Sequence, residues 1–187
     1  QALKSFESYL ASYPNGAFAS ECHYHLGNLE LQNGNRELAI SHFTKVSAQF
    51  GNRYQEEASE KAADMSYENK SYDVALENYT TLNKVSTTKI LKNKSSLGML
   101  RCNYNLNNHN QVIENATAVI SSPESDEAIK KEALYYRSKS YLSKGQDALA
   151  KTDLIKISTE LKTAAGAESA YLLSDLYFRQ GSLKESE

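Results

Sequence analysis

Apolar side chains recur along this chain at intervals of three and four residues, which is the spacing of one helix face. At the start of the chain the apolar positions are Ala2, Leu3, Phe6, Tyr9, Leu10 and Tyr13. Continued to the end, the pattern predicts about ten helices, over residues 1–13, 17–32, 36–50, 54–69, 72–86, 90–106, 109–121, 126–143, 146–161 and 166–180. No segment alternates apolar and polar residues for long enough to form a strand, so we expect an all-α fold.

A four-position pattern recurs across these helices. Its first copy consists of Gly27, Gly34, Ala39 and Phe43, at intervals of seven, five and four residues. Equivalent sets are Ala63, Lys70, Ala75 and Tyr79; Leu100, Asn107, Val112 and Ala116; and Ser138, Gly145, Ala150 and Leu154, with parts of the pattern at Ala2, Phe6, Ser174, Gly181 and Ser186. From Ala2 onward, successive sites of the Ala39 type lie 37, 36, 37, 38 and 36 residues apart. A fixed period in this range indicates a repeat architecture.

Each copy predicts a helix, a turn and a second helix. We expect four full units, at residues 17–52, 53–88, 89–124 and 125–163, with half units at 1–16 and 164–187. No change of composition and no linker rich in Pro, Gly or Ser divides the 187 residues, so one continuous solenoid domain is the simplest interpretation. Because the first residues have the pattern of the middle of an amphipathic helix, the sequence favours a fragment of a longer protein.

Specific positions carry specific expectations. Gly34 and Gly145 suit a turn because glycine accepts the left-handed backbone that closes a helix, while Asn107 is the next best residue type for that backbone. The residues expected at close helix crossings are Ala39, Ala75, Val112 and Ala150. Helix 36–50 is expected to bury Leu38, Ala39, Phe43, Val46 and Phe50.

The repeat resembles the tetratricopeptide repeat family, whose helix-turn-helix unit has a similar length and small residues where its helices cross. The matching residues are Leu26, Gly27, Ala39 and Phe43; Tyr72, Asp73, Val74, Ala75 and Tyr79; and Tyr141, Gly145 and Ala150. The resemblance covers essentially the whole chain and implies a right-handed α-solenoid of antiparallel helix pairs. The chain departs from the family pattern because it lacks tryptophan and fills small sites with Leu100 and Ser138. Its units are also slightly longer, which we interpret as longer links between units.

A narrower resemblance lies in the run from Phe6 to Ala19, which has the form F-x-x-Y-L-x-x-Y-P-x-x-x-x-A. This run is similar to repeats in bacterial cell-envelope scaffolds, including outer-membrane assembly lipoproteins and Tol-Pal-associated proteins. It implies a location in the periplasm or cell envelope of a bacterium. A cytoplasmic location is the alternative, because cytoplasmic members of the family have similar runs.

Composition restricts the classes of partner. A net charge of -2 and a pI near 6.1 argue against nucleic acid, because phosphate binding needs clustered Lys and Arg. No apolar run approaches the ~18 residues needed to cross a bilayer, so no membrane-spanning segment is expected. Cys22 and Cys102 lie in units two apart and are expected to be buried and unpaired. The sequence leaves the oligomeric state open.

The chain carries no recognisable enzyme motif. The phosphate loop, the dinucleotide fingerprint, the zincin helix and the nucleophile elbow are all absent from the sequence. His23 and His25 are two residues apart, so they do not share a helix face. Four acidic residues between Glu56 and Asp64 do share a face, for which a solvated surface is favoured over a cation site. We therefore expect no catalytic residue, no metal and no cofactor.

In the tetratricopeptide family the first helix of each unit lines a concave groove that holds other polypeptides. By this analogy the partner-binding residues are Tyr24 and Asn28; Asp64 and Tyr67; Leu97, Arg101 and Tyr104; Tyr135 and Lys139; and Tyr171 and Asp175. Tyrosine suits such a surface because it offers a large apolar body with a polar tip. The alternative interpretation is that these rings pack between neighbouring helices. The family's clamp for C-terminal carboxylates is not reproduced, because Tyr24 stands where a lysine is needed.

The sequence thus predicts a non-catalytic scaffold that binds a partner protein or peptide in this groove. The alternative is a helical accessory domain of a larger enzyme, or of a glycan-uptake or envelope-assembly machine, that positions a neighbouring domain. Binding is expected to centre on Tyr67, Leu97, Arg101, Tyr104, Tyr135 and Lys139.

Overall fold

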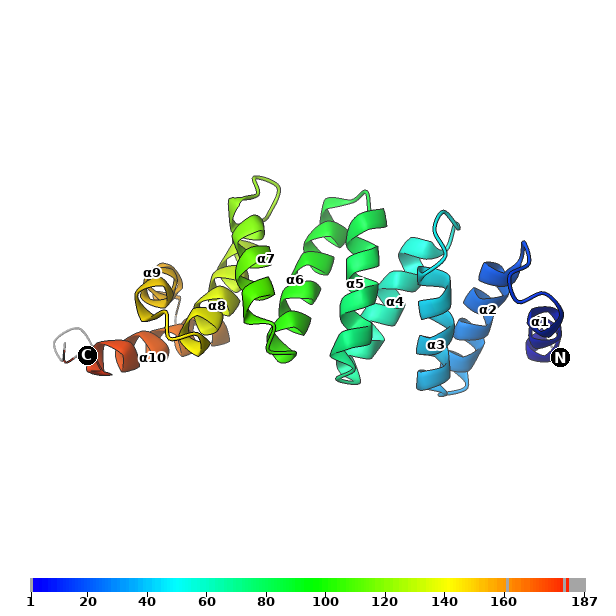
Figure 1. The fold of residues 1–187 in the computed structure, drawn as a ribbon, viewed down its shortest axis with the longest axis horizontal. Coiled ribbons are helices and arrows are strands. Elements are labelled where there is room, and N and C mark those ends of the chain that lie inside the picture. The colour runs from blue at the N-terminus through cyan, green and yellow to red at the C-terminus, as the bar shows by residue number, and fades with distance from the viewer. Residues whose placement is uncertain (1, 161, 180, 182–187) are drawn as a thin grey trace. The chain divides into compact units, whose positions relative to one another are not determined.

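A computed structural model describes residues 2–160, 162–179 and 181 of the chain. Within these residues the chain forms ten α-helices and no strand, so the all-α prediction is confirmed for the described part (Figure 1). The helices are α1 (Ala2–Ser12), α2 (Ala19–Gln32), α3 (Arg36–Ser47), α4 (Gln55–Glu68), α5 (Tyr72–Val85), α6 (Lys89–Asn105), α7 (His109–Ser121), α8 (Glu127–Ser143), α9 (Asp147–Ile157) and α10 (Ala164–Arg179). The predicted pattern site at Ser186, the predicted helix end at residue 180 and the last residues of the half unit 164–187 lie outside the described residues.

The packing divides the chain into two compact units, Gln1–Cys102 and Asn103–Glu187, and the boundary falls within α6. In the first unit α1 packs on α2, α2 on α3, α3 on α4 and α4 on α5. In the second unit α7 packs on α8, α8 on α9 and α9 on α10. Neighbouring helices are therefore packed in chain order within each unit, as in a helical repeat. The handedness and the number of repeats stay predictions.

Four turns between paired helices share one backbone geometry. The turn residues Gly34, Lys70, Asn107 and Gly145 all have positive φ, at 80°, 61°, 59° and 68°. In each turn the next N–H donates to a carbonyl five residues earlier: Asn35 to Glu30, Ser71 to Ser66, Asn108 to Asn103 and Gln146 to Tyr141, all at 2.9 Å. This is the Schellman motif, which gives hydrogen-bond partners to carbonyl groups that have none within the last turn of a helix. The predicted turn positions are confirmed, including the two that lack glycine.

The expected helix-crossing residues form the core. Ala39, Ala75, Val112 and Ala150 expose none of their surface, as predicted. The space at these crossings is small: a Cβ added at Gly27 would lie 2.8 Å from the ring of Phe43. Cys22 and Cys102 are both buried and free, in agreement with the sequence analysis.

Two burial predictions for the helix at residues 36–50 were wrong. Helix α3 ends at Ser47, and Phe50 lies in the following turn with 93% of its surface exposed. Leu38 is 53% exposed. Successive helix positions differ by about 100° around the axis, so when Ala39 faces the crossing its neighbour Leu38 turns outward. In the described part of the chain, every helix is too short or too polar to cross a membrane.

Candidate functional site

The predicted groove residues divide between the two units. Tyr24 and Asn28 lie on α2, Asp64 and Tyr67 on α4, and Leu97 and Arg101 on the part of α6 that belongs to the first unit. Tyr104, at the end of α6, belongs to the second unit with Tyr135 and Lys139 of α8 and Tyr171 and Asp175 of α10. The structure therefore presents two groups of candidate residues, one on each unit.

In the first unit, Tyr24 and Asn28 are tied to the next first helix. The Tyr24 ring stacks on Tyr54, with centroids 4.1 Å apart. Lys61 of α4 lies 5.2 Å from the centre of the Tyr24 ring, and its Nζ donates to Asn28 Oδ1 at 2.8 Å. Burial raises the pKa of Tyr24, and a hydrogen bond to Glu57 raises it further. These two residues thus link α2 to α4.

Asp64 lies at the centre of a polar network. Its Oδ1 accepts a hydrogen bond from Tyr79 at 2.8 Å, and its Oδ2 accepts one from Lys94 at 2.6 Å. Lys94 also donates to Glu60 at 2.6 Å. Burial alone would lower the pKa of Lys94, but the hydrogen bonds to Asp64 and Glu60 outweigh it and raise that pKa. Burial, followed by the bond to Asp64, raises the pKa of Tyr79. We call Glu60, Asp64 and Lys94 the first clasp.

The remaining candidates of the first unit are half-buried. Tyr67 packs against Tyr72, with centroids 5.4 Å apart, beside a core cluster that includes Ala75 and Leu82. Leu97 and Arg101 are also half-buried on α6. The first unit therefore uses its predicted tyrosines to pack neighbouring helices, with only part of each ring exposed.

A second clasp joins α8 to α10 in the second unit. Lys139 Nζ donates to Glu168 at 2.8 Å and to Tyr135 Oη at 3.0 Å, and Tyr135 donates to the other oxygen of Glu168. The same Nζ lies 5.1 Å from the ring centre of Tyr104 and 5.0 Å from that of Tyr135. Burial disfavours the charge on Lys139, but bonds to Glu168 and Tyr135 raise its pKa. The bond to Lys139 in turn lowers the pKa of Glu168. We call Tyr135, Lys139 and Glu168 the second clasp.

The two clasps occupy the same repeat positions with reversed charges. Asp64 and Lys139 each follow a small site of the pattern, Ala63 and Ser138, by one residue. Lys94 and Glu168 each precede the next such site, Leu100 and Ser174, by six residues. Sequence reasoning missed Lys94 and Glu168. The signal that could have found them is a pair of opposite charges at these two positions in consecutive units.

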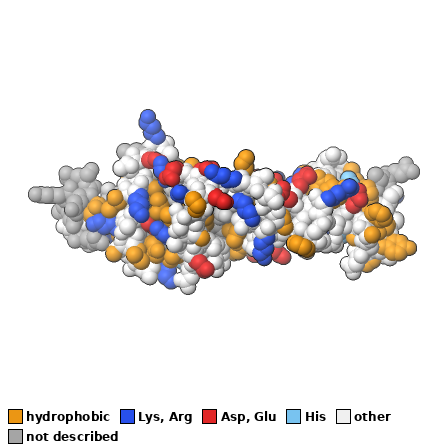
Figure 2. Space-filling model, turned by 90° about the horizontal axis from the view of Figure 1, so that it is seen from above, with side chains coloured by type: hydrophobic (Ala, Val, Ile, Leu, Met, Phe, Trp, Pro, Cys, Tyr) orange, Lys and Arg blue, Asp and Glu red, His pale blue; other side chains and the backbone are white. Residues whose placement is uncertain are grey.

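Tyr171 on α10 is the most exposed of the candidate residues, whereas Asp175 is half-buried. Tyr171 is 71% exposed, and Asp175 accepts a hydrogen bond from Arg179 Nε at 2.9 Å. Charged side chains of both signs lie interspersed on the face seen in Figure 2.

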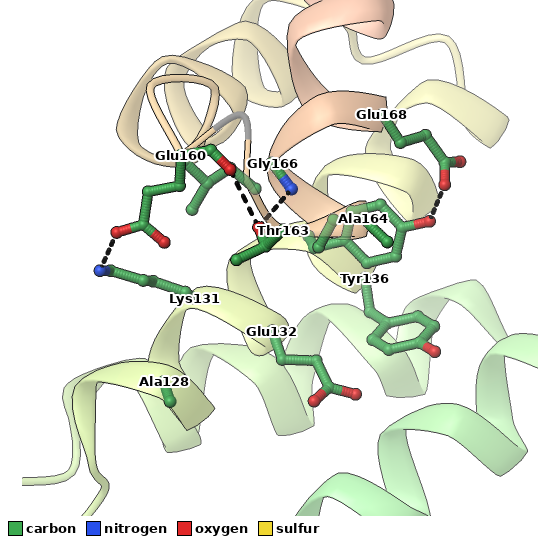
Figure 3. A pocket seen from close by; sticks show the side chains of 12 residues that line it. Ala128, Lys131, Glu132, Tyr136, Glu160, Thr163, Ala164, Gly166 and Glu168 are labelled. Atoms are coloured by element: carbon green, nitrogen blue, oxygen red, sulfur yellow. Dashed lines mark hydrogen bonds and ion pairs between the residues drawn. The ribbon is translucent and has the colours of Figure 1, made fainter.

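A pocket of about 370 Å³ opens beside the second clasp, between α8, α10 and the link that precedes α10 (Figure 3). Its lining includes Glu132, Tyr135 and Tyr136 from α8, Glu160 from the link and Glu168 from α10. We call it the acidic tyrosine pocket. Of its lining residues, only Tyr135 was predicted from the sequence, because the others meet only when α10 packs beside α8.

Small residues keep the link close to α10. A Cβ at Gly166 would lie 2.2 Å from the Glu160 carbonyl oxygen, so only glycine fits there. The Gly166 N–H donates to Thr163 Oγ1 at 3.0 Å, and the Thr163 N–H donates to the Glu160 carbonyl at 2.9 Å. Glu160 also accepts a bond from Lys131 (Figure 3). The wall of the pocket is therefore fixed by backbone contacts as well as by side chains.

Two further hollows lie at equivalent turns. One, of about 530 Å³, is lined by residues 107–111 with Asn103 and Lys144, and the other, of about 420 Å³, by residues 34–38 with Asn69. Both are open surfaces formed where a helix-pair turn lies beside the end of the next first helix.

The structure pairs His23 with His42, not with its sequence neighbour His25. Their Nδ1 atoms lie 2.9 Å apart, so one ring donates and the other accepts according to tautomer. Burial, then electrostatic interaction with His42 and Lys45, lowers the pKa of His23 to about 4. Among the described residues, no group of three or more His, Cys, Asp or Glu side chains could hold a metal ion.

Comparison with known proteins adds no relative from which a role could be transferred. No protein-family model matches the chain, and no curated protein matches it.

Proposed function

We propose that this chain is a non-catalytic scaffold of the tetratricopeptide type that binds a partner polypeptide along the first helices of its units. The observation that carries the proposal is the acidic tyrosine pocket, which opens between two successive first helices, α8 and α10, beside the predicted residue Tyr135. Pockets that combine aromatic walls with a few polar groups are the usual anchor points of peptide-binding surfaces.

The packing of the candidate tyrosines refines this proposal. Tyr104 and Tyr135 are half-buried beside Lys139, so each offers part of its ring to a partner and part to the helix packing. Partner binding at this surface therefore acts on a preformed wall, which keeps the entropic cost of ordering side chains low. The likeness of the run from Phe6 to Ala19 to envelope scaffolds supports a bacterial cell-envelope location for the same function.

The test is to select peptides from a displayed random library on the folded chain and to titrate them against variants. Tyr104→Ala and Tyr135→Ala should each weaken binding by ~1–2 kcal/mol, because central aromatic residues dominate such interfaces. The matched controls are Leu149→Ala and Ile155→Ala on α9, a second helix of the same unit, whose side chains are 49% and 48% exposed. The proposal fails if the α9 variants lose binding while the tyrosine variants, with helicity intact by circular dichroism, keep it.

A further inference from the structure

We propose that the acidic tyrosine pocket receives an aromatic side chain of the bound polypeptide, which stacks on Tyr135. This inference rests on the proposed function and specifies the chemistry of the partner at one position. The pocket has a volume of about 370 Å³, within the range of about 300–1,000 Å³ that small-molecule sites occupy. It therefore has room for a ring rather than only for a flat contact.

The charged residues that line the pocket already have partners. Lys131 pairs with Glu160, and Glu168 pairs with Lys139. In Figure 3 the first pair lies on one side of the pocket and Glu168 on the other. Glu132 also interacts with a neighbouring group. A charged guest would lose its hydration without meeting an unpaired charge in return, so the pocket favours an uncharged guest.

The apolar part of the lining is what remains for such a guest. Tyr135 and Tyr136 are half-buried, so part of each ring is accessible. The other apolar side chains of the lining are Ala128, Ile157, Ala164 and Ala165. Three of these are alanines, whose small side chains leave the space beside the rings open.

In the first unit a ring already occupies the equivalent place. The ring of Tyr54 stacks there on Tyr24, with centroids 4.1 Å apart and planes at 12° to each other. Tyr24 and Tyr135 hold the same repeat position, because each lies three residues before the small site of its own helix. The two tyrosines thus extend from equivalent points on α2 and α8.

The second unit has no such ring to cover Tyr135. Tyr54 lies nine residues before the small site of α4, and the residue nine before the small site of α10 is Ala165. Ala165 and Tyr135 both line the pocket. The pocket therefore opens where an alanine stands in place of the stacking tyrosine. An aromatic side chain of the partner can fill this place, and stacked rings gain more than the burial of their area alone provides.

The experiment titrates the isotope-labelled chain with N-acetyl-phenylalanine methylamide and follows its amide and methyl signals by NMR. N-acetyl-alanine methylamide is the matched control ligand without the ring, and N-acetyl-arginine methylamide is the charged control. We expect the phenylalanine probe to shift the methyl signals of Ala128, Ala164 and Ala165, because its ring current acts on nearby protons. It should bind about tenfold more tightly than either control, since part of the phenyl ring leaves water. Added salt should not weaken it, because no ionic attraction is screened.

Two variants close the pocket. Ala165→Tyr supplies a ring at the position that Tyr54 holds in the first unit and should abolish binding of the phenylalanine probe. Ala128→Phe, at an exposed position of the lining, should block the pocket as well, and it decides the question if Ala165→Tyr unfolds. Ala148→Phe, at an exposed position of α9 outside the lining, is the control and should leave binding unchanged. Circular dichroism checks that each variant stays helical.

The proposal is overturned if the three probes bind equally, if the phenylalanine shifts fall outside the lining, or if binding survives in a folded variant that closes the pocket. Peptides selected on the chain separate this failure from failure of the proposed function. If those peptides depend on Tyr104 and Tyr135 but need no aromatic side chain, the scaffold function stands and the aromatic guest does not. If the phenylalanine probe binds as expected and no selected peptide depends on these tyrosines, the pocket stands and the scaffold function fails.

Discussion

At the scale of single residues, the backbone of the turns decides more than their side chains do. Gly34 and Gly145 adopt left-handed conformations that glycine accepts without strain, whereas Lys70 and Asn107 hold the same conformation with a Cβ. Their neighbours make the same hydrogen bonds in all four turns. The repeat therefore imposes the turn on whatever residue occupies it, at a local cost where that residue is not glycine.

This cost predicts that glycine at the second turn stabilises the protein. Lys70→Gly should raise the free energy of unfolding by ~0.5–1 kcal/mol, because relief of left-handed strain exceeds the added flexibility of the unfolded chain. Asn107→Gly should gain less, since asparagine tolerates this conformation better than lysine. Urea unfolding measures both. Gly34→Ala is the control, because it places a Cβ on a left-handed backbone and should lower the free energy of unfolding. If Lys70→Gly, Asn107→Gly and Gly34→Ala all had the same free energy of unfolding, the argument from backbone strain would be contradicted.

The His23–His42 pair predicts a pH dependence of stability. The pKa of His23 is lowered to about 4 in the folded chain, chiefly by burial, against 6.5 for the free side chain. The unfolded chain therefore takes up this proton first, so stability present above pH 6.5 is lost as the pH falls toward 4. Because the ring is only half-buried, we expect a loss of roughly 1 kcal/mol after solvent screening.

Urea unfolding at pH 7 and pH 5 tests this dependence. His23→Gln should lose less stability between the two pH values than the parent chain does, because it lacks the shifted group. An identical pH profile for the parent and His23→Gln would show that the pair does not titrate in this way.

At the scale of elements, successive first helices are joined by polar clasps. Lys94 links α6 to α4, and Lys139 and Glu168 link α8 to α10. These groups are half-exposed, so each clasp contributes specificity of packing more than stability. Buried ion pairing is of another kind: Arg137 and Asp153 make two bonds, at 2.7 and 2.8 Å, with side chains only 13% and 3% exposed.

Exchanging the charges of Lys139 and Glu168 tests whether their contact stabilises the packing of α8 against α10. Lys139→Glu and Glu168→Lys each bring like charges together and should lower the free energy of unfolding by ~0.5–1 kcal/mol. The double exchange restores opposite charges, in the order that the first clasp already uses, and should recover most of the loss. Urea unfolding of the four chains gives the coupling free energy. If the double variant lost as much unfolding free energy as the two single variants together, the contact between residues 139 and 168 would not contribute to stability.

The buried pair predicts a much larger effect. Asp153→Ala leaves the Arg137 guanidinium buried without its carboxylate and should cost ~3–5 kcal/mol of unfolding free energy. Its matched control is Asp147→Ala on the same helix, α9, which breaks the exposed contact with Arg179 at 3.7 Å and should cost less than about 1 kcal/mol. Thermal unfolding of both variants measures the difference between the buried and the exposed ion pair. Equal midpoints for Asp153→Ala and Asp147→Ala would show that burial does not strengthen the Arg137–Asp153 pair.

At the scale of the whole molecule, packing between sequence neighbours predicts local responses to substitution. Ala39 has no exposed surface and belongs to a core cluster that joins α3 to α4, so Ala39→Phe should overpack this cluster and cost ~1–3 kcal/mol. Because repeat arrays are stabilised by nearest-neighbour contacts, the loss should concentrate in the first unit. Hydrogen exchange should show reduced protection in α2 to α4 and little change in α8 and α9. Equal loss in all helices would contradict this picture.

The sequence was sufficient for the helices, for the turn positions and for the buried crossings, because periodicity and local backbone chemistry determine these features. It was insufficient for Phe50, whose apolar side chain continues the helical spacing after α3 has ended. It was also insufficient for the acidic tyrosine pocket. Glu132, Glu160 and Glu168 come from two helices and a link, and only their packing brings them together.

The reversed clasps have a consequence for how an array of similar helices finds its correct order. During folding, a first helix could meet the wrong neighbour, since the units repeat one sequence pattern. If α10 took the place of α6 beside α4, Glu168 would meet Glu60 and Asp64, and the contact would be repulsive. In the native packing Lys94 pairs with the acidic residues of α4, and Glu168 pairs with Lys139 of α8. The opposite order of charges in the two clasps thus discourages α6 and α10 from exchanging places, at little expense in stability.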